Sequence, residues 1–112
     1  MKKLLLALLL LCLFCTCKKD PYANICGGKN PIENLPWLKA EIDTLQKSNY
    51  QYIIKRGIYQ NKTIFSESII CALCNSIILY YDCDGNEIHL TSEQYNYLLN
   101  NSFPNAETIW KN

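Results

Sequence analysis

The sequence predicts an α+β fold, in which an N-terminal helix packs on a small antiparallel sheet of about four strands and a short helix lies near the C-terminus. Three observations support this prediction. Apolar residues recur at helical spacing between positions 36 and 47, and strand-like runs separated by turn residues follow from 50 to 90. A Thr-x-x-Gln pattern that suits a helix start then appears at position 91. We place a single small domain at residues 31–112.

The N-terminus has the pattern of an export signal that ends at a lipid attachment site. Lys2 and Lys3 precede an apolar run over residues 4–14, which has the length of a signal core and is too short to span a bilayer. The chain then reaches Cys17 and turns abruptly polar. We interpret residues 1–16 as a lipoprotein signal peptide and Cys17 as the lipidated first residue of the mature chain. The alternative is an ordinary secretory signal, in which Cys17 is incidental.

Cys17 suits lipidation better than the two cysteines before it. Thr16, which precedes Cys17, is fairly small, whereas bulky Phe14 precedes Cys15. Cys12 lies inside the apolar run. The pattern resembles a bacterial lipoprotein signal of the looser kind that Bacteroidota tolerate, which implies a membrane-anchored protein of the cell envelope, held at the outer membrane on its periplasmic or surface face.

Residues 17–30 are expected to form the lipidated cysteine and a tether, because they lack periodicity and contain Pro21 and a Gly-Gly pair. The whole chain carries 11 basic and 10 acidic residues, and removal of the leader takes away Lys2 and Lys3. The mature net charge is therefore about −1, which offers no electrostatic footprint for nucleic acid. We expect no nucleic-acid partner.

A first helix is predicted over residues 36–47. Pro31 and Pro36 suit the start of a helix, where the missing N–H of proline costs nothing. The residues with helical spacing are Leu35, Leu38, Ile42 and Leu45.

Strands are predicted where β-branched and aromatic residues gather between turn signals. The unbroken apolar run from Ile77 to Tyr81 favours a strand buried on both faces. Turns are expected around Asn61 and Gly85, where Asn and Gly tolerate a positive φ. The expected strands cover residues 50–58, 63–70, 76–82 and 87–90.

The C-terminal part is predicted to start with a capping box, in which Thr91 is the N-cap and Gln94 is the third helical residue. The helix should end near Asn101, because Pro104 follows shortly afterwards. Residues 107–110 could add a last edge strand.

Cysteine usage indicates an oxidising compartment. If Cys17 carries lipid, the folded part keeps an even number of cysteines, which in a small exported chain predicts disulfides. The candidates are Cys26, Cys71, Cys74 and Cys83.

Strand length limits which of these cysteines can pair. The predicted third strand separates Cys74 from Cys83 by about 30 Å, whereas a disulfide needs Cα atoms within about 7 Å. Cys71 lies farther back along the chain. We therefore expect Cys83 to pair with Cys26, while Cys71 and Cys74 pair locally or stay reduced.

Two segments resemble small uncharacterised lipoproteins of Bacteroidota: Asn-Pro-Ile-Glu-Asn-Leu-Pro-Trp-Leu at residues 30–38, and Leu-Tyr-Tyr-Asp-Cys-Asp-Gly-Asn-Glu-Ile at residues 79–88. The resemblance spans most of residues 26–90. It implies a structural framework and no catalytic residue. Many members carry a cysteine shortly after the Gly-Asn turn, where this chain has His89.

The residues that could carry other chemistry have structural explanations. Cys71 and Cys74 form a CxxC, but a thioredoxin-like site needs a helix directly after the first cysteine, and strand-like runs flank this one. A zinc site would need a second paired motif. The Asp82-x-Asp84 pattern resembles part of a calcium loop but lacks the ligand series and the closing Glu of such a loop, and a β-turn explains the same residues. The single histidine, His89, has no serine–acid partner that the sequence identifies.

The sequence therefore favours a non-enzymatic, lipid-anchored envelope protein that binds a protein or a glycan. A thiol-redox or metal-binding envelope protein that uses the CxxC is the alternative, and an inhibitor of an external hydrolase is a third class. No catalytic residue, metal ligand set or cofactor is assigned.

Overall fold

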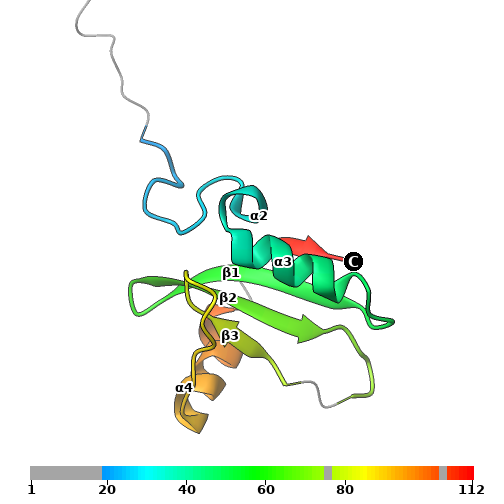
Figure 1. Ribbon diagram of the computed structural model, residues 1–112. Coiled ribbons are helices and arrows are strands. Elements are labelled where there is room, and N and C mark those ends of the chain that lie inside the picture. Colours follow the sequence, from blue (N-terminus) through cyan, green and yellow to red (C-terminus); the bar gives the residue numbers. More distant parts are fainter. Residues whose placement is uncertain (1–18, 75–76, 104–105) are drawn as a thin grey trace, which may run out of the picture.

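The protein contains a four-stranded antiparallel sheet with short helices against its two faces (Figure 1). This computed structural model describes residues 19–74, 77–103 and 106–112. The strands lie in the order β3–β2–β1–β4, and each neighbouring pair is antiparallel. The predicted α+β class, with an antiparallel sheet and short helices, is confirmed. The predicted signal peptide, 1–16, and Cys17 lie outside the described residues.

Helices α2 (Pro31–Asn34) and α3 (Pro36–Leu45) each begin with a proline in the first turn. Helix α3 starts at the predicted residue, 36, and ends two residues before the predicted end, 47. Its apolar stripe packs on one face of the sheet, where a first core cluster combines Leu38, Ile42 and Leu45 with Ile54 and Phe65. This cluster holds α3 over the two central strands, and Figure 1 shows the helix in that place.

The central hairpin consists of β1 (Tyr52–Tyr59) and β2 (Lys62–Ile69), one or two residues away from the expected limits. Only Gln60 and Asn61 connect the strands, and both adopt positive φ, at +50° and +61°. Consecutive positive φ values are the requirement of the tight hairpin turn whose twist matches that of the strands.

Strand β3 (Leu79–Tyr81) is shorter than the predicted range 76–82. Tyr80 is buried, but the side chain of Ile77 is 75% exposed. The prediction of a strand buried on both faces along the whole apolar run is therefore wrong for its first part. The start of the predicted range, at Ser76, lies outside the described residues.

The predicted strand at 87–90 is also wrong. A single bridge joins Glu87 to Tyr81, and the chain then leaves the sheet, where Ile88 and Leu90 pack against a second core cluster. The fourth strand is β4 (Glu107–Lys111), which pairs with β1 at the far edge.

The other face of the sheet is covered by α4 (Ser92–Tyr97) and a π-helical turn, η2 (Leu98–Ser102). The capping box is confirmed, since the Thr91 hydroxyl accepts from the Gln94 amide and the Gln94 side chain accepts from the Thr91 amide. The second core cluster combines Ile64, Tyr80, Leu98 and Phe103.

Candidate functional site

The candidate site is a pocket of about 620 Å³ at the end of the sheet where the β1–β2 hairpin turns. Four segments enclose it: the N-terminal segment, the hairpin turn, the turn after β3, and the stretch that leads into α4. Tyr59 and Lys62 come from the hairpin, Asp84 from the turn after β3, and His89 and Leu90 from the fourth segment. The pocket thus combines an aromatic ring, apolar side chains and polar groups, which is the usual composition of a ligand site.

One wall of the pocket is the disulfide between Cys26 and Cys83, the pairing expected from the sequence, with Cα atoms 5.9 Å apart. Two hydrogen bonds hold its ends. The Cys26 amide donates to the Thr63 hydroxyl at 3.1 Å, and the Trp37 indole N–H donates to the Cys83 carbonyl at 2.8 Å. The disulfide therefore joins the N-terminal segment, the sheet and α3 at one point.

The Asp82 carboxylate organises the turn that carries Cys83. Its Oδ1 accepts hydrogen bonds of 2.9 Å from the backbone amides of Asp84 and Asn86. Gly85 completes the turn with a φ of +83°, and a Cβ at this position would lie 2.7 Å from the ring of Trp37. The residues that resembled a calcium loop thus form a β-turn, and no group of three or more metal-ligating side chains occurs among the residues that the structure describes.

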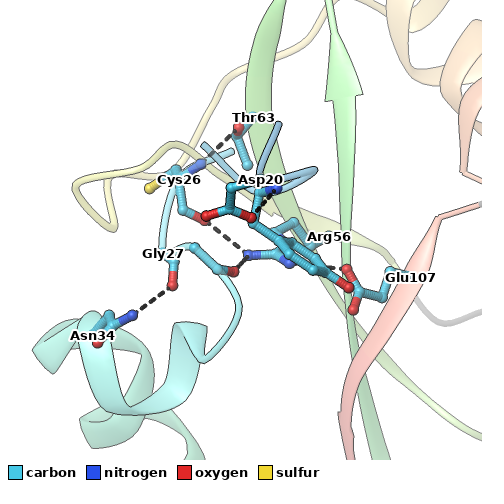
Figure 2. A network of polar contacts seen from close by, with 9 residues as sticks. Asp20, Cys26, Gly27, Asn34, Arg56, Thr63 and Glu107 are labelled. Carbon is cyan, nitrogen blue, oxygen red and sulfur yellow. Dashed lines mark hydrogen bonds and ion pairs between the residues drawn. The ribbon is translucent and has the colours of Figure 1, made fainter. Parts of the chain in front are cut away.

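Arg56 holds the N-terminal segment against the sheet (Figure 2). Its side chain is buried in β1, and its Nη1 donates to the carbonyls of Cys26 and Gly28 at 3.0 and 2.7 Å. Its Nη2 forms an ion pair of 2.9 Å with Glu107 of β4. The last part of the expected tether is thus docked on the domain, and it contributes Asn24 and Cys26 to the pocket.

A buried carboxyl lies beneath α3, away from the pocket. Glu67 of β2 is only 8% exposed, and its Oε2 has no hydrogen-bond partner among the described residues. Burial, and then the charge of Glu41 on α3, raise the pKa of Glu67 to about 7. On the opposite face, burial raises the pKa of Tyr80 to about 12.

The other candidate cysteines lie far from this pocket. Cys71 and Cys74 form a disulfide with Cα atoms 5.6 Å apart in the exposed loop after β2, at the opposite end of that strand. Since all four candidate cysteines are joined in pairs, their thiolates are not available to a metal in this state. The single His89 lies at the exposed rim of the pocket.

Sequence reasoning missed Arg56 and the pocket. A signal for Arg56 existed, because alternation along β1 places it on the same face as buried Ile54 and half-buried Tyr52. A charged residue on a buried strand face must find partners. The pocket had no comparable signal, because it joins the N-terminal segment, the β1–β2 hairpin and the stretch after β3, which are far apart in the sequence.

Comparison with protein-family models, with curated proteins and with solved structures finds no match to this chain. The resemblance to Bacteroidota lipoproteins therefore stays a prediction. Among the described residues, no helix combines the length and apolar character needed to cross a membrane.

Proposed function

We propose that this chain is a lipoprotein of the cell envelope, anchored to a membrane through a lipid on Cys17, and that its domain is a non-enzymatic binding module for glycans. The leader over residues 1–16 supports the anchor. The observation that carries the binding role is the pocket beside the Cys26–Cys83 disulfide, which combines the Tyr59 ring with side-chain amides and apolar contacts.

The pocket composition suits a hydroxyl-rich, uncharged ligand. Side-chain amides of Asn24, Gln60 and Gln94 line it and supply both donors and acceptors. Ile88 and Leu90 add apolar surface that can face the C–H groups of a sugar ring. The positive charge of Lys62 offsets part of the negative charge of Asp82 and Asp84. The pocket therefore has no strong electrostatic preference for a charged ligand.

The anchor would place this pocket near the membrane. Cys17 and Cys26 are nine positions apart, and a fully extended chain of that length spans at most about 30 Å. Because Arg56 and the disulfide fix Cys26 to the domain, the pocket beside Cys26 would lie within about that distance of the anchor.

Fractionation of cells that express the full chain tests the anchor. We expect the wild-type protein in the membrane fraction and a Cys17→Ser variant released from it or retained as an uncleaved precursor. Cys15→Ser is the matched control, because it changes a neighbouring cysteine and should leave the protein in the membrane. A Cys17→Ser protein that stays in the membrane fraction at the size of the cleaved wild-type protein would contradict the lipid attachment at Cys17.

Binding of detergent-extracted protein to an array of purified glycans tests the module. We expect Tyr59→Ala and His89→Ala to weaken glycan binding by about tenfold or more, which corresponds to about 1.4 kcal/mol each. Tyr50→Ala is the control, because Tyr50 is an exposed tyrosine at the other end of β1. Failure of the wild-type protein to bind any glycan, or equal binding by all variants, would contradict the proposal.

A further inference from the structure

The two disulfides occupy opposite ends of β2 and differ in their surroundings. Cys26 contacts the first core cluster, and its disulfide to Cys83 forms a wall of the pocket. The Cys71–Cys74 disulfide lies in the loop after Ile69, where β2 ends. Figure 1 shows this loop at the end of the sheet farthest from the N-terminal segment.

The loop that carries the Cys71–Cys74 disulfide is open to solvent. Residues 71–74 are all exposed, and Leu73 between the cysteines is 99% exposed. Either sulfur is therefore accessible to a reagent that approaches from solution, because no neighbouring element among the described residues buries this segment.

The fold does not depend on this disulfide. Neither core cluster contains a residue of the segment 71–74. Within the described part of the chain, the last hydrogen bond before the segment joins the Ile70 amide to the Gln51 carbonyl, and the next joins the Ile78 amide to the Tyr95 hydroxyl. The packed structure is thus held on both sides of the loop independently of the bond within it.

The two disulfides also constrain the unfolded chain unequally. Cys26 and Cys83 are 57 positions apart in sequence, whereas Cys71 and Cys74 are three apart. The entropy that a crosslink removes from an unfolded chain grows with the length of the loop that it closes. Reduction of the short loop therefore releases far less conformational freedom and meets less resistance from the folded state.

We propose that Cys71–Cys74 is a reversible redox site, reduced by an envelope dithiol protein, while Cys26–Cys83 stays oxidised. A thiolate of the dithiol attacks one of the two sulfurs and forms a mixed disulfide, and the released cysteine takes up a proton. The second thiol of the dithiol then displaces the remaining cysteine. In total, Cys71–Cys74 gains two electrons and two protons, and the dithiol becomes a disulfide.

The surroundings make this site a substrate of exchange and not its catalyst. Catalytic CxxC motifs lower the pKa of their first cysteine at the N-terminus of a helix. In this chain the element that follows the loop is β3 (Leu79–Tyr81), and the loop residues 71–74 carry no basic side chain. The inference does not rest on the lipid anchor or on the glycan pocket.

Graded reduction of the folded full-length protein tests this inference. The protein in detergent is equilibrated with mixtures of reduced and oxidised dithiothreitol, alkylated with N-ethylmaleimide and analysed by peptide mapping, which separates each pair from the leader cysteines. We expect Cys71 and Cys74 to be labelled at a reduced-to-oxidised ratio about tenfold or more below that needed for Cys26 and Cys83. The circular dichroism spectrum should stay unchanged at that ratio, and removal of the reductant should restore the bond.

A double variant, Cys71→Ser with Cys74→Ser, provides the matched control. It should fold, keep the Cys26–Cys83 bond and take up no label in the domain at the low ratio. Labelling of all four cysteines of the wild-type domain at the same ratio would overturn the proposal. Loss of the folded spectrum when only Cys71 and Cys74 are reduced would overturn it as well.

Discussion

At the scale of single residues, Arg56 determines how the N-terminal segment is attached. It is a buried arginine that three oxygens satisfy, two of them backbone carbonyls of the segment and one a carboxylate of β4. The fork of N–H groups on a guanidinium can reach all three at once, which the single ammonium of lysine achieves less well. The segment that leads to the proposed anchor thus depends on one side chain of the central strand.

Replacement of Arg56 by methionine should destabilise the domain by about 3 kcal/mol, because it leaves the carbonyls of Cys26 and Gly28 without their donor. Thermal unfolding measures the loss. Arg56→Lys should recover part of the stability, and Lys111→Met, at an exposed position, should change it little. Equal melting temperatures for wild type and Arg56→Met would contradict this role.

Gly85 is a second residue on which local structure depends. Its φ is +83°, and a Cβ there would lie 2.7 Å from ring atoms of Trp37. We expect Gly85→Ala to cost about 1–3 kcal/mol through strain and displacement of the indole. Gly28→Ala is the control: its φ is also positive, at +58°, but a Cβ there would lie an ordinary 3.7 Å from the side-chain amide of Asn34. Similar losses in chemical denaturation of both variants would show that the Trp37 contact is unimportant.

At the scale of elements, α3 packs over a sheet face that contains a carboxyl group. The side chain of Glu67 on β2 lies near Glu41 of α3 and Tyr81 of β3. The pKa of Glu67 is raised because the carboxyl is buried and because Glu41 is negatively charged. Glu87 lies near Tyr81 and adds to the negative charge on this side. The contact between α3 and the sheet therefore favours a protonated Glu67.

Stability should fall as pH rises from about 5 to about 8. The pKa of Glu67 is raised from 4.5 in the unfolded reference to about 7 in the fold, so the folded state binds more protons between these values. The stabilisation that comes from protonated Glu67 is complete below about pH 4.5 and is lost as pH rises through about 7. The Glu67→Gln variant should show a smaller pH dependence of its melting temperature over this window. The same slope in both proteins would contradict the assignment to Glu67.

The elements that could be predicted from sequence are those whose signal is local. The spacing of Leu38, Ile42 and Leu45 and the capping box at Thr91 locate helices without any knowledge of the rest of the fold. The segment 87–90 misled because its apolar side chains, Ile88 and Leu90, are half-buried against the second core cluster, while a single bridge at Glu87 is its only ladder pairing among the described residues. The alternation of apolar residues indicates that one side of a segment is buried, but it does not show which element that side packs against.

Non-local contacts explain what the sequence did not predict about the site. Strand β4 pairs with β1 across about fifty residues, and the pocket joins Asn24, Tyr59 and His89, which no spacing rule connects. The Cys26–Cys83 pairing could be predicted because an extended strand between Cys74 and Cys83 would hold these two cysteines too far apart to bond. The role of Cys17 remains a prediction from the leader pattern.

At the scale of the whole molecule, the long disulfide unites the N-terminal segment with the turn after β3. It closes a loop of 58 residues, for which the chain-entropy model gives about 4 kcal/mol. We expect Cys83→Ser to lower the melting temperature by roughly 15 °C or more, and Cys74→Ser by only a few degrees. Calorimetry of the two variants measures the difference. A larger effect of Cys74→Ser would contradict the structural role of the Cys26–Cys83 bond.

The intact mass of the full-length protein extracted from bacterial membranes tests the central proposal most directly. If the chain is a lipoprotein, the mass should equal that of residues 17–112 plus a diacylglyceryl group and, where present, a further acyl chain, with all added mass on the peptide that contains Cys17. Mild base should remove the ester-linked chains. A mature chain without added mass, or one whose N-terminus lies elsewhere, would contradict the lipid anchor.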